Sequence, residues 1–168
     1  MGWIGGLLLM AAGTGMGWYM AARLRQRVTF LETCGRLLQA LWQEMSYTAQ
    51  PMTDLWRRLA QSEAFAAFSL VQDTAQGLPQ TDFAAAFSAA VDKAQGEGLL
   101  TAENRSILLE FAVGCGRTDL DGQQAHVEYY RTLLTAGEED ARRTYAEKGR
   151  VYRVLGFTAG VAVALLLM

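Results

Sequence analysis

Histidine, cysteine and lysine, which carry much of enzyme chemistry, are scarce in this chain of 168 residues. The only histidine is His126, and the only cysteines are Cys34 and Cys115. The thiols lie 81 positions apart without the Cys-x-x-Cys spacing of zinc sites, and either would have only His126 as an imidazole base. Neither Lys93 nor Lys148, the only lysines, follows a glycine-rich phosphate-binding loop. The sequence therefore predicts no enzyme, no bound metal and no cofactor.

Charge is distributed unevenly along the chain. The net charge is −2 and the pI about 5.4, a balance that does not favour nucleic-acid binding. Arg23, Arg25 and Arg27 give a local charge of +3, and residues 142–153 carry +4. Residues 28–141 between them carry −9. An acidic middle region is thus bracketed by two basic segments.

Both ends of the chain are apolar. Residues 3–22 carry no charge, and as a helix they would span about 30 Å, the thickness of a bilayer core. The positive charge follows this segment rather than preceding it, which argues against a cleaved signal peptide. Residues 154–168 are also uncharged, and no polar face interrupts them as it would in a buried core helix. We expect transmembrane helices in residues 1–24 and 151–168.

The basic segments predict the topology. Basic residues collect on the cytosolic side of membranes, and both segments adjoin the middle of the chain. Residues 25–150 are therefore expected in the cytosol and both termini outside, as in a multi-pass protein of the cell membrane. Because cytosolic thiols stay reduced, no disulfide is expected.

Each apolar end contains glycines spaced four residues apart, a spacing that lets membrane helices approach closely. The pairs are Gly2/Gly6, Gly13/Gly17 and Gly156/Gly160. They could join the two ends of one chain, or two copies in a homo-oligomer, or have no role in pairing, since glycine is common in membrane helices.

The middle region is predicted to be helical throughout, because its apolar residues recur at spacings of three and four. One such stripe precedes Pro51, where helical geometry is disfavoured, and consists of Leu31, Cys34, Leu38, Leu41 and Met45. Shorter helices are expected around Leu55, Trp56 and Leu59, and then around Phe65, Phe68 and Val71. The fold class is all-α, a bundle of about six helices between the two apolar ends.

Capping residues divide the rest of the bundle. Thr81 and Asp82 are expected to cap one helix and Thr101 the next, with Phe87 and Phe111 as core candidates. Thr118 with Asp121 resembles a capping box that opens a long last helix. That helix is expected to run into the C-terminal span, and its apolar side includes Leu120, Val127, Tyr130, Leu134, Ala141 and Tyr145.

Two polar clusters are candidates for a partner-binding surface. The candidate residues are Glu44 and Tyr47 in the first cluster, and Arg117, Asp119 and Gln123 in the second. Helix termination and capping would explain Gly114, Gly116, Thr118 and Asp119 without any function. They leave Glu44, Arg117 and Gln123 unexplained, so we expect these side chains to be exposed.

The order of the motifs in this chain resembles that of a known family, and the resemblance covers essentially the full length of the chain. The motifs are Glu44…Tyr47…Pro51, then Leu108-Leu109-Glu110-Phe111…Gly116-Arg117-Thr118-Asp119…Gln123, then Lys148-x-x-x-Tyr152-Arg153-x-Leu155-Gly156 before the terminal span. Together with the two apolar ends, they resemble the stage III sporulation protein AB family of endospore-forming bacteria. This chain departs from the family pattern at Ala112, where glycine is expected, and at Cys115, where leucine is expected.

The resemblance implies a role in the channel complex between mother cell and forespore. The family is similar to the inner-membrane platform protein of type II secretion systems, whose cytosolic domains are six-helix bundles. By this resemblance the partners are a secretion-type ATPase and other channel membrane proteins, and the protein lies in the outer forespore membrane with its bundle in the mother-cell cytosol. The alternative function is a membrane-anchored helical sensor or regulatory adaptor that binds a small ligand or a signalling protein.

Overall fold

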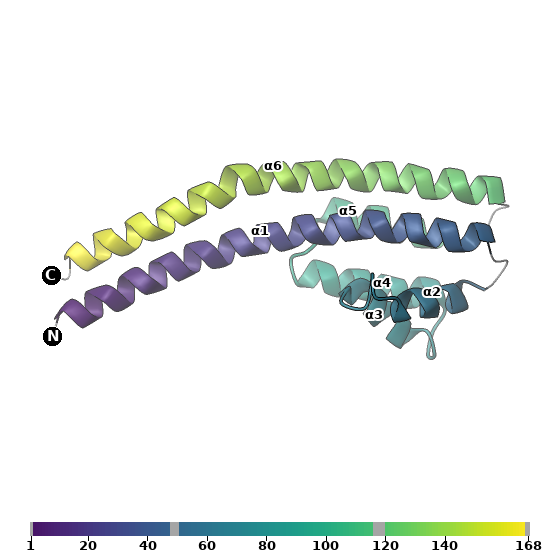
Figure 1. The fold of residues 1–168 in the computed structure, drawn as a ribbon, viewed down its shortest axis with the longest axis horizontal. Coiled ribbons are helices and arrows are strands. Elements are labelled where there is room, and N and C mark those ends of the chain that lie inside the picture. The colour runs from purple at the N-terminus through teal and green to yellow at the C-terminus, as the bar shows by residue number, and fades with distance from the viewer. Residues whose placement is uncertain (1, 48–50, 116–119, 167–168) are drawn as a thin grey trace. The chain divides into compact units, whose positions relative to one another are not determined.

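The protein is helical throughout the part that the structure, a computed structural model, describes. It describes the backbone of residues 2–47, 51–115 and 120–166, and the side chains of these except 2–10, 120, 121, 153, 160 and 163–166. Within these ranges there are six helices and no strand (Figure 1). They are α1 (Gly2–Tyr47), α2 (Met52–Gln61), α3 (Ser69–Gly77), α4 (Phe83–Gly96), α5 (Ala102–Gly114) and α6 (Leu120–Leu166). The predicted all-α class and the long, unbroken last helix are confirmed.

The chain forms two compact units. Unit 1 comprises residues 1–29 and 139–168, and unit 2 comprises residues 30–138. Because α1 and α6 are long, each contributes residues to both units.

Unit 1 pairs the beginning of α1 with the end of α6, which lie side by side (Figure 1). Their backbones meet at glycines. A Cβ added at Gly156 would lie 2.6 Å from the Gly13 carbonyl oxygen and 3.0 Å from the Gly17 Cα, and one at Gly17 would meet the carbonyl oxygen of Tyr152. Of the three roles considered for the glycines, pairing of the two ends within one chain is thus present in the structure.

Apolar side chains are largely exposed on unit 1. Its buried side chains include Ala21, Val28 and Ala141. Its exposed ones include Met16, Trp18, Tyr19, Met20, Val151, Val154, Leu155 and Phe157. Across the described residues, no helix combines the length and the apolar content needed to cross a bilayer.

Unit 2 has an aromatic core. Trp56 of α2 packs edge-on against Phe87 of α4, with ring centroids 5.5 Å apart, and Phe87 contacts Phe111 of α5 at 6.4 Å. Phe111 contacts Tyr130 of α6 at 5.9 Å, so the chain of rings passes through four helices. Trp56, Phe87 and Phe111 are 0% exposed, which confirms the two predicted core phenylalanines. The Trp56 indole N–H donates to the Val71 carbonyl at 3.1 Å, so its polar atom is satisfied inside the core.

Two predicted helix caps are present, whereas the Thr81 hydroxyl donates back to the Gly77 carbonyl at 3.2 Å and does not cap α4. The Asp82 carboxylate accepts from the Ala85 N–H at 2.8 Å, and the Thr101 hydroxyl accepts from the Asn104 N–H at 3.2 Å. Each satisfies an N–H group that has no carbonyl partner in the first turn of its helix. Helix α1 ends before Pro51, as expected. The capping box at Thr118 lies outside the described residues.

The helix expected around Phe65, Phe68 and Val71 is present, but it begins later than expected. Helix α3 begins only at Ser69, and residues 62–68 form turns in which the Phe65 N–H donates to Ser62 and the Phe68 N–H to Phe65. The Gln72 amide supports the turn by donating to the carbonyls of Ala60 at 2.8 Å and Phe65 at 3.3 Å. Both phenylalanines are buried even so, because their spacing of three suits consecutive tight turns as well as a helix.

Candidate partner-binding site

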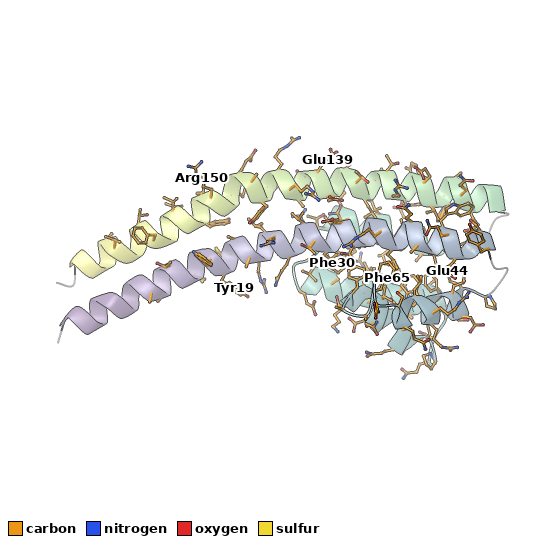
Figure 2. All side chains as sticks on the ribbon, viewed as in Figure 1. Tyr19, Phe30, Glu44, Phe65, Glu139 and Arg150 are labelled. Carbon is orange, nitrogen blue, oxygen red and sulfur yellow. The ribbon has the colours of Figure 1, made fainter. Side chains whose placement is uncertain are left out.

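Glu44 lies on the C-terminal part of α1 (Figure 2). Its carboxylate Oε2 is 3.3 Å from Nη2 of Arg58 on α2, and both side chains are about half exposed. The ion pair with Arg58 thus gives Glu44 a structural role, which the sequence alone did not show. Exposed ion pairs contribute little to stability, about 0–1 kcal/mol, so the pair leaves this carboxylate accessible to a partner.

Tyr47 is the last residue of α1 and is 88% exposed. An aromatic side chain that packs against none of the core contributes little to the fold. Tyrosine offers a large apolar face and a hydroxyl at low entropic cost, which suits contact surfaces between proteins. Of the five candidates, Tyr47 is the most accessible in the part of the chain that the structure describes.

Gln123 on α6 is 3% exposed, and the expectation that its side chain is on the surface is wrong. Gln123 precedes Val127 by four residues and Leu134 by eleven, so all three lie on one face of α6. Val127 and Leu134 are both buried, and Gln123 is buried with them. The spacing alone places Gln123 on this apolar face, but its polar side chain led to the prediction that it is exposed.

Arg117 and Asp119 lie outside the described residues. The flanking ends of α5 and α6 are described, and there His126 packs against α5. The His126 Nε2 is 3.0 Å from the Phe111 carbonyl oxygen, and the two rings stack with centroids 5.4 Å apart. A Cβ at Gly114 would overlap the His126 ring, so glycine is needed there for close packing. His126 therefore has a structural role at this end of unit 2.

Val113 and Tyr129, near the same end of unit 2, were missed by the sequence reasoning. They are 55% and 60% exposed. Val113 is next to buried Ala112, and Tyr129 next to half-buried Tyr130, so both point away from the apolar stripe of their own helix. A large apolar residue out of phase with its stripe was the signal that could have identified them.

Both thiols and one tyrosine of unit 2 have raised pKa values. Burial raises the pKa of the Cys115 thiol from 9.0 to about 12 and raises that of Cys34 further, so neither supplies a thiolate at neutral pH. Burial, with smaller contributions from Glu110 and Tyr129, also raises the pKa of Tyr130. Among the described residues, no group of three potential ligands is placed to hold a metal ion.

Together these features define a class: an all-α protein of two helical units. The family model for stage III sporulation protein AB matches residues 2–168. The chain belongs to the stage III sporulation protein AB family.

Two relatives show how far the similarity extends. Stage III sporulation protein AB of Bacillus subtilis (strain 168) is 29% identical over 171 residues, which cover 98% of each chain. A solved structure of a stage III sporulation protein AB matches with a TM-score of 0.59 and 22% identity, covering 72% of this chain and 97% of that one. This match supports the fold alone.

Proposed function

We propose that the protein is a non-catalytic platform component of the sporulation channel complex between mother cell and forespore, where it couples a cytosolic secretion-type ATPase to the channel in the membrane. The observation that carries this proposal is the family match over residues 2–168, which spans both apolar ends and the whole helical middle. In this proposal residues 1–24 and 151–168 are the membrane anchors, and residues 25–150 face the ATPase.

Three features of unit 1 support a membrane anchor. It carries eight basic and three acidic residues, whereas unit 2 carries seven basic and fourteen acidic ones. Its large apolar side chains are exposed, as suits contact with lipid tails. Its helices meet through Gly13, Gly17 and Gly156, a kind of contact that membrane helices use because lipid gives them little hydrophobic incentive to associate.

The partner surface is proposed to include Glu44 and Tyr47, together with Arg117 and Asp119, whereas Gln123 lies beneath the surface. Tyr47 and Glu44 supply direct contacts, since both side chains reach the surface. Gln123 is buried and acts by positioning the start of α6. Other channel membrane proteins would contact unit 1 within the bilayer.

Cysteine labelling in intact cells tests the topology. Gln76 on α3 is exposed, and a membrane-impermeant maleimide should label Gln76→Cys only after the cells are permeabilised. The unmodified chain is the control, because its native thiols, with raised pKa values, react poorly. Labelling of Gln76→Cys in intact cells would place unit 2 outside and end the proposal.

Affinity capture tests the partner. The full-length protein in detergent should retain the secretion-type ATPase of the same complex, and Tyr47→Ala and Glu44→Ala should each weaken retention. Truncation at a desolvated contact costs about 2–5 kcal/mol, at least about a thirtyfold loss of affinity. Glu63→Ala, an exposed acidic residue between α2 and α3, is the matched control and should bind as the wild type does. Equal binding by all three variants would place the surface elsewhere.

A further inference from the structure

A pocket opens on unit 1 near the inner edge of its apolar segment. Its volume is about 300 Å³, and its lining residues are Trp18, Ala21, Ala22 and Arg25 of α1, and Tyr145 of α6. The four residues of α1 follow the spacing i, i+3, i+4, i+7 and so share one face of the helix. Ala21 is buried, whereas Trp18 and Arg25 are exposed. The pocket therefore has a small apolar floor and a rim that carries two aromatic rings and one cation.

The cation on the rim differs from its two neighbours. Arg23 lies over the ring of Tyr19, 5.4 Å from its centroid, and Arg27 is 3.9 Å from the carboxylate of Asp140. Arg25 forms no ion pair with any carboxylate in the described part of the chain, and it is the one of the three that lines the pocket. A guanidinium binds phosphate oxygens through paired hydrogen bonds, which makes the rim suited to a phosphate group.

The two aromatic residues of the rim, Trp18 and Tyr145, also suit the headgroup layer of a bilayer. Trp and Tyr concentrate where the apolar core of a bilayer meets its headgroups, because each ring has an apolar body and a polar N–H or O–H. A notional Cβ at Gly149 would lie 3.2 Å from the Tyr145 ring, so the absence of a side chain at Gly149 leaves space for the ring beside the pocket. The rim thus combines a phosphate-binding cation with two side chains that favour the headgroup layer.

We propose that this pocket binds the phosphate headgroup of an anionic membrane lipid. The inference rests on the proposed function, in which unit 1 lies in the membrane. Basic pockets between membrane helices on the cytosolic side are a known way to hold such headgroups.

A lipid fits the pocket better than a soluble phosphate compound does. The pocket lies along the middle of α1, where the backbone N–H groups are already bonded within the helix, so they offer nothing to a free anion. Its other α1 residues, Ala21, Ala22 and Trp18, have no charge. The exposed Met16 and Met20 on the same segment give acyl chains apolar surface to cover, and a soluble phosphate cannot use that surface.

Mass spectrometry of lipids retained by the full-length protein tests the pocket. The protein is released from detergent micelles that contain equal amounts of phosphatidylglycerol, which is anionic, and phosphatidylcholine, which is zwitterionic. The wild type should retain phosphatidylglycerol with about a tenfold preference, and Arg25→Gln should remove that preference, because one charge-assisted hydrogen bond is worth about that factor. Ala22→Phe, which fills the pocket and keeps the charge, should remove it as well.

Arg150→Gln is the matched control. It removes the same charge from unit 1, and Figure 2 shows Arg150 on the side of α6 that faces away from α1. This variant should keep the wild-type preference. An equal loss of the preference for phosphatidylglycerol in Arg25→Gln and Arg150→Gln would mean that general surface charge attracts the lipid. That result would overturn the proposal that the pocket binds it. Displacement of the lipid by an equal concentration of glycerol phosphate would show that the acyl chains add nothing to binding and would overturn the lipid assignment.

Alkaline carbonate extraction of cell membranes tests the proposed membrane anchor independently of the lipid pocket. The wild type and Arg25→Gln should both remain in the membrane pellet. If the wild type is released, the membrane anchor itself is wrong, and the lipid pocket falls with it. If both proteins remain while Arg25→Gln and Ala22→Phe retain phosphatidylglycerol normally, only the pocket is wrong.

Discussion

The two units solve the problem of holding helices together in opposite ways. Unit 2 buries large side chains, and its rings pass from Trp56 through Phe87 and Phe111 to Tyr130. Unit 1 brings backbones together at Gly13, Gly17 and Gly156 and leaves its large apolar side chains exposed. Burying apolar side chains stabilises helices in water, whereas close backbone packing works without that driving force. The two units are therefore held together by different kinds of contact.

The largest effect is expected from the core of unit 2. Phe87→Ala should destabilise the full-length protein in detergent by about 3–5 kcal/mol, because the ring is fully buried and its removal leaves a cavity. Thermal unfolding followed by circular dichroism measures the change. Val113→Ala is the control, since this exposed side chain should change stability by less than about 0.5 kcal/mol. A loss below about 1 kcal/mol for Phe87→Ala would mean that unit 2 does not depend on its rings.

The next largest effect is expected from the glycine contacts of unit 1. Gly17→Leu places a side chain against the Tyr152 carbonyl, and forcing such overpacking costs about 1–3 kcal/mol. Gly15→Leu is a matched control, because a Cβ at Gly15 has no atom within 4 Å. Unfolding in detergent by added dodecyl sulfate should separate the two variants. Equal stability of the two would show that the glycine contact does not hold unit 1 together.

Raising the pH by one unit above 9 should weaken unit 2 by a smaller amount. Burial raises the pKa of Cys115 from 9.0 to about 12 in the folded protein, so above pH 9 the unfolded chain has released a proton that the folded chain keeps. Stability is therefore fully present below pH 9 and falls as the pH rises toward 12, by at most about 1.4 kcal/mol per pH unit for this group. Denaturant unfolding of wild type and Cys115→Ala at several pH values measures the slope. The variant should show the shallower one, and identical slopes would exclude Cys115 as a source of the loss.

The smallest effect is expected at the charged surface of unit 2. Arg105 Nε lies 2.6 Å from the carboxylate of Asp92, and both side chains are substantially exposed. Such pairs contribute less than about 1 kcal/mol, and salt screens them. Arg105→Gln should therefore unfold at nearly the wild-type denaturant concentration, and added salt should remove the remaining difference. A loss comparable to that of Phe87→Ala would contradict the view that unit 2 is held by its core.

Sequence reasoning succeeded where a local signal determines the structure. The caps at Asp82 and Thr101 and the end of α1 before Pro51 depend on the backbone chemistry of a few neighbouring residues. It failed at Phe68, where the Gln72 amide bonds to carbonyls from an earlier turn and the helix begins later. These hydrogen bonds join residues that are not neighbours in the sequence, so the periodicity of apolar residues does not predict them.

The candidate site was predicted less well than the fold. The exposure of Tyr47 fits its place at the end of a helix, whereas the partner of Glu44 comes from Arg58 on another element. Gln123 was misjudged because its polarity was given more weight than its position on the apolar face of α6. Which glycines pair was left open because close backbone approach is a tertiary property.

The division of the chain into units also sets an order of assembly during synthesis. Unit 2 is one continuous segment, and α2 to α5 pack on their neighbours in sequence, so its contacts close short loops. Unit 1 joins residues 1–29 to residues 139–168, so its N-terminal half has no partner until the whole of unit 2 has left the ribosome. The Gly17–Gly156 contact is therefore among the last to form, and a stalled or truncated chain would have a folded bundle while residues 1–29 still lacked their partner.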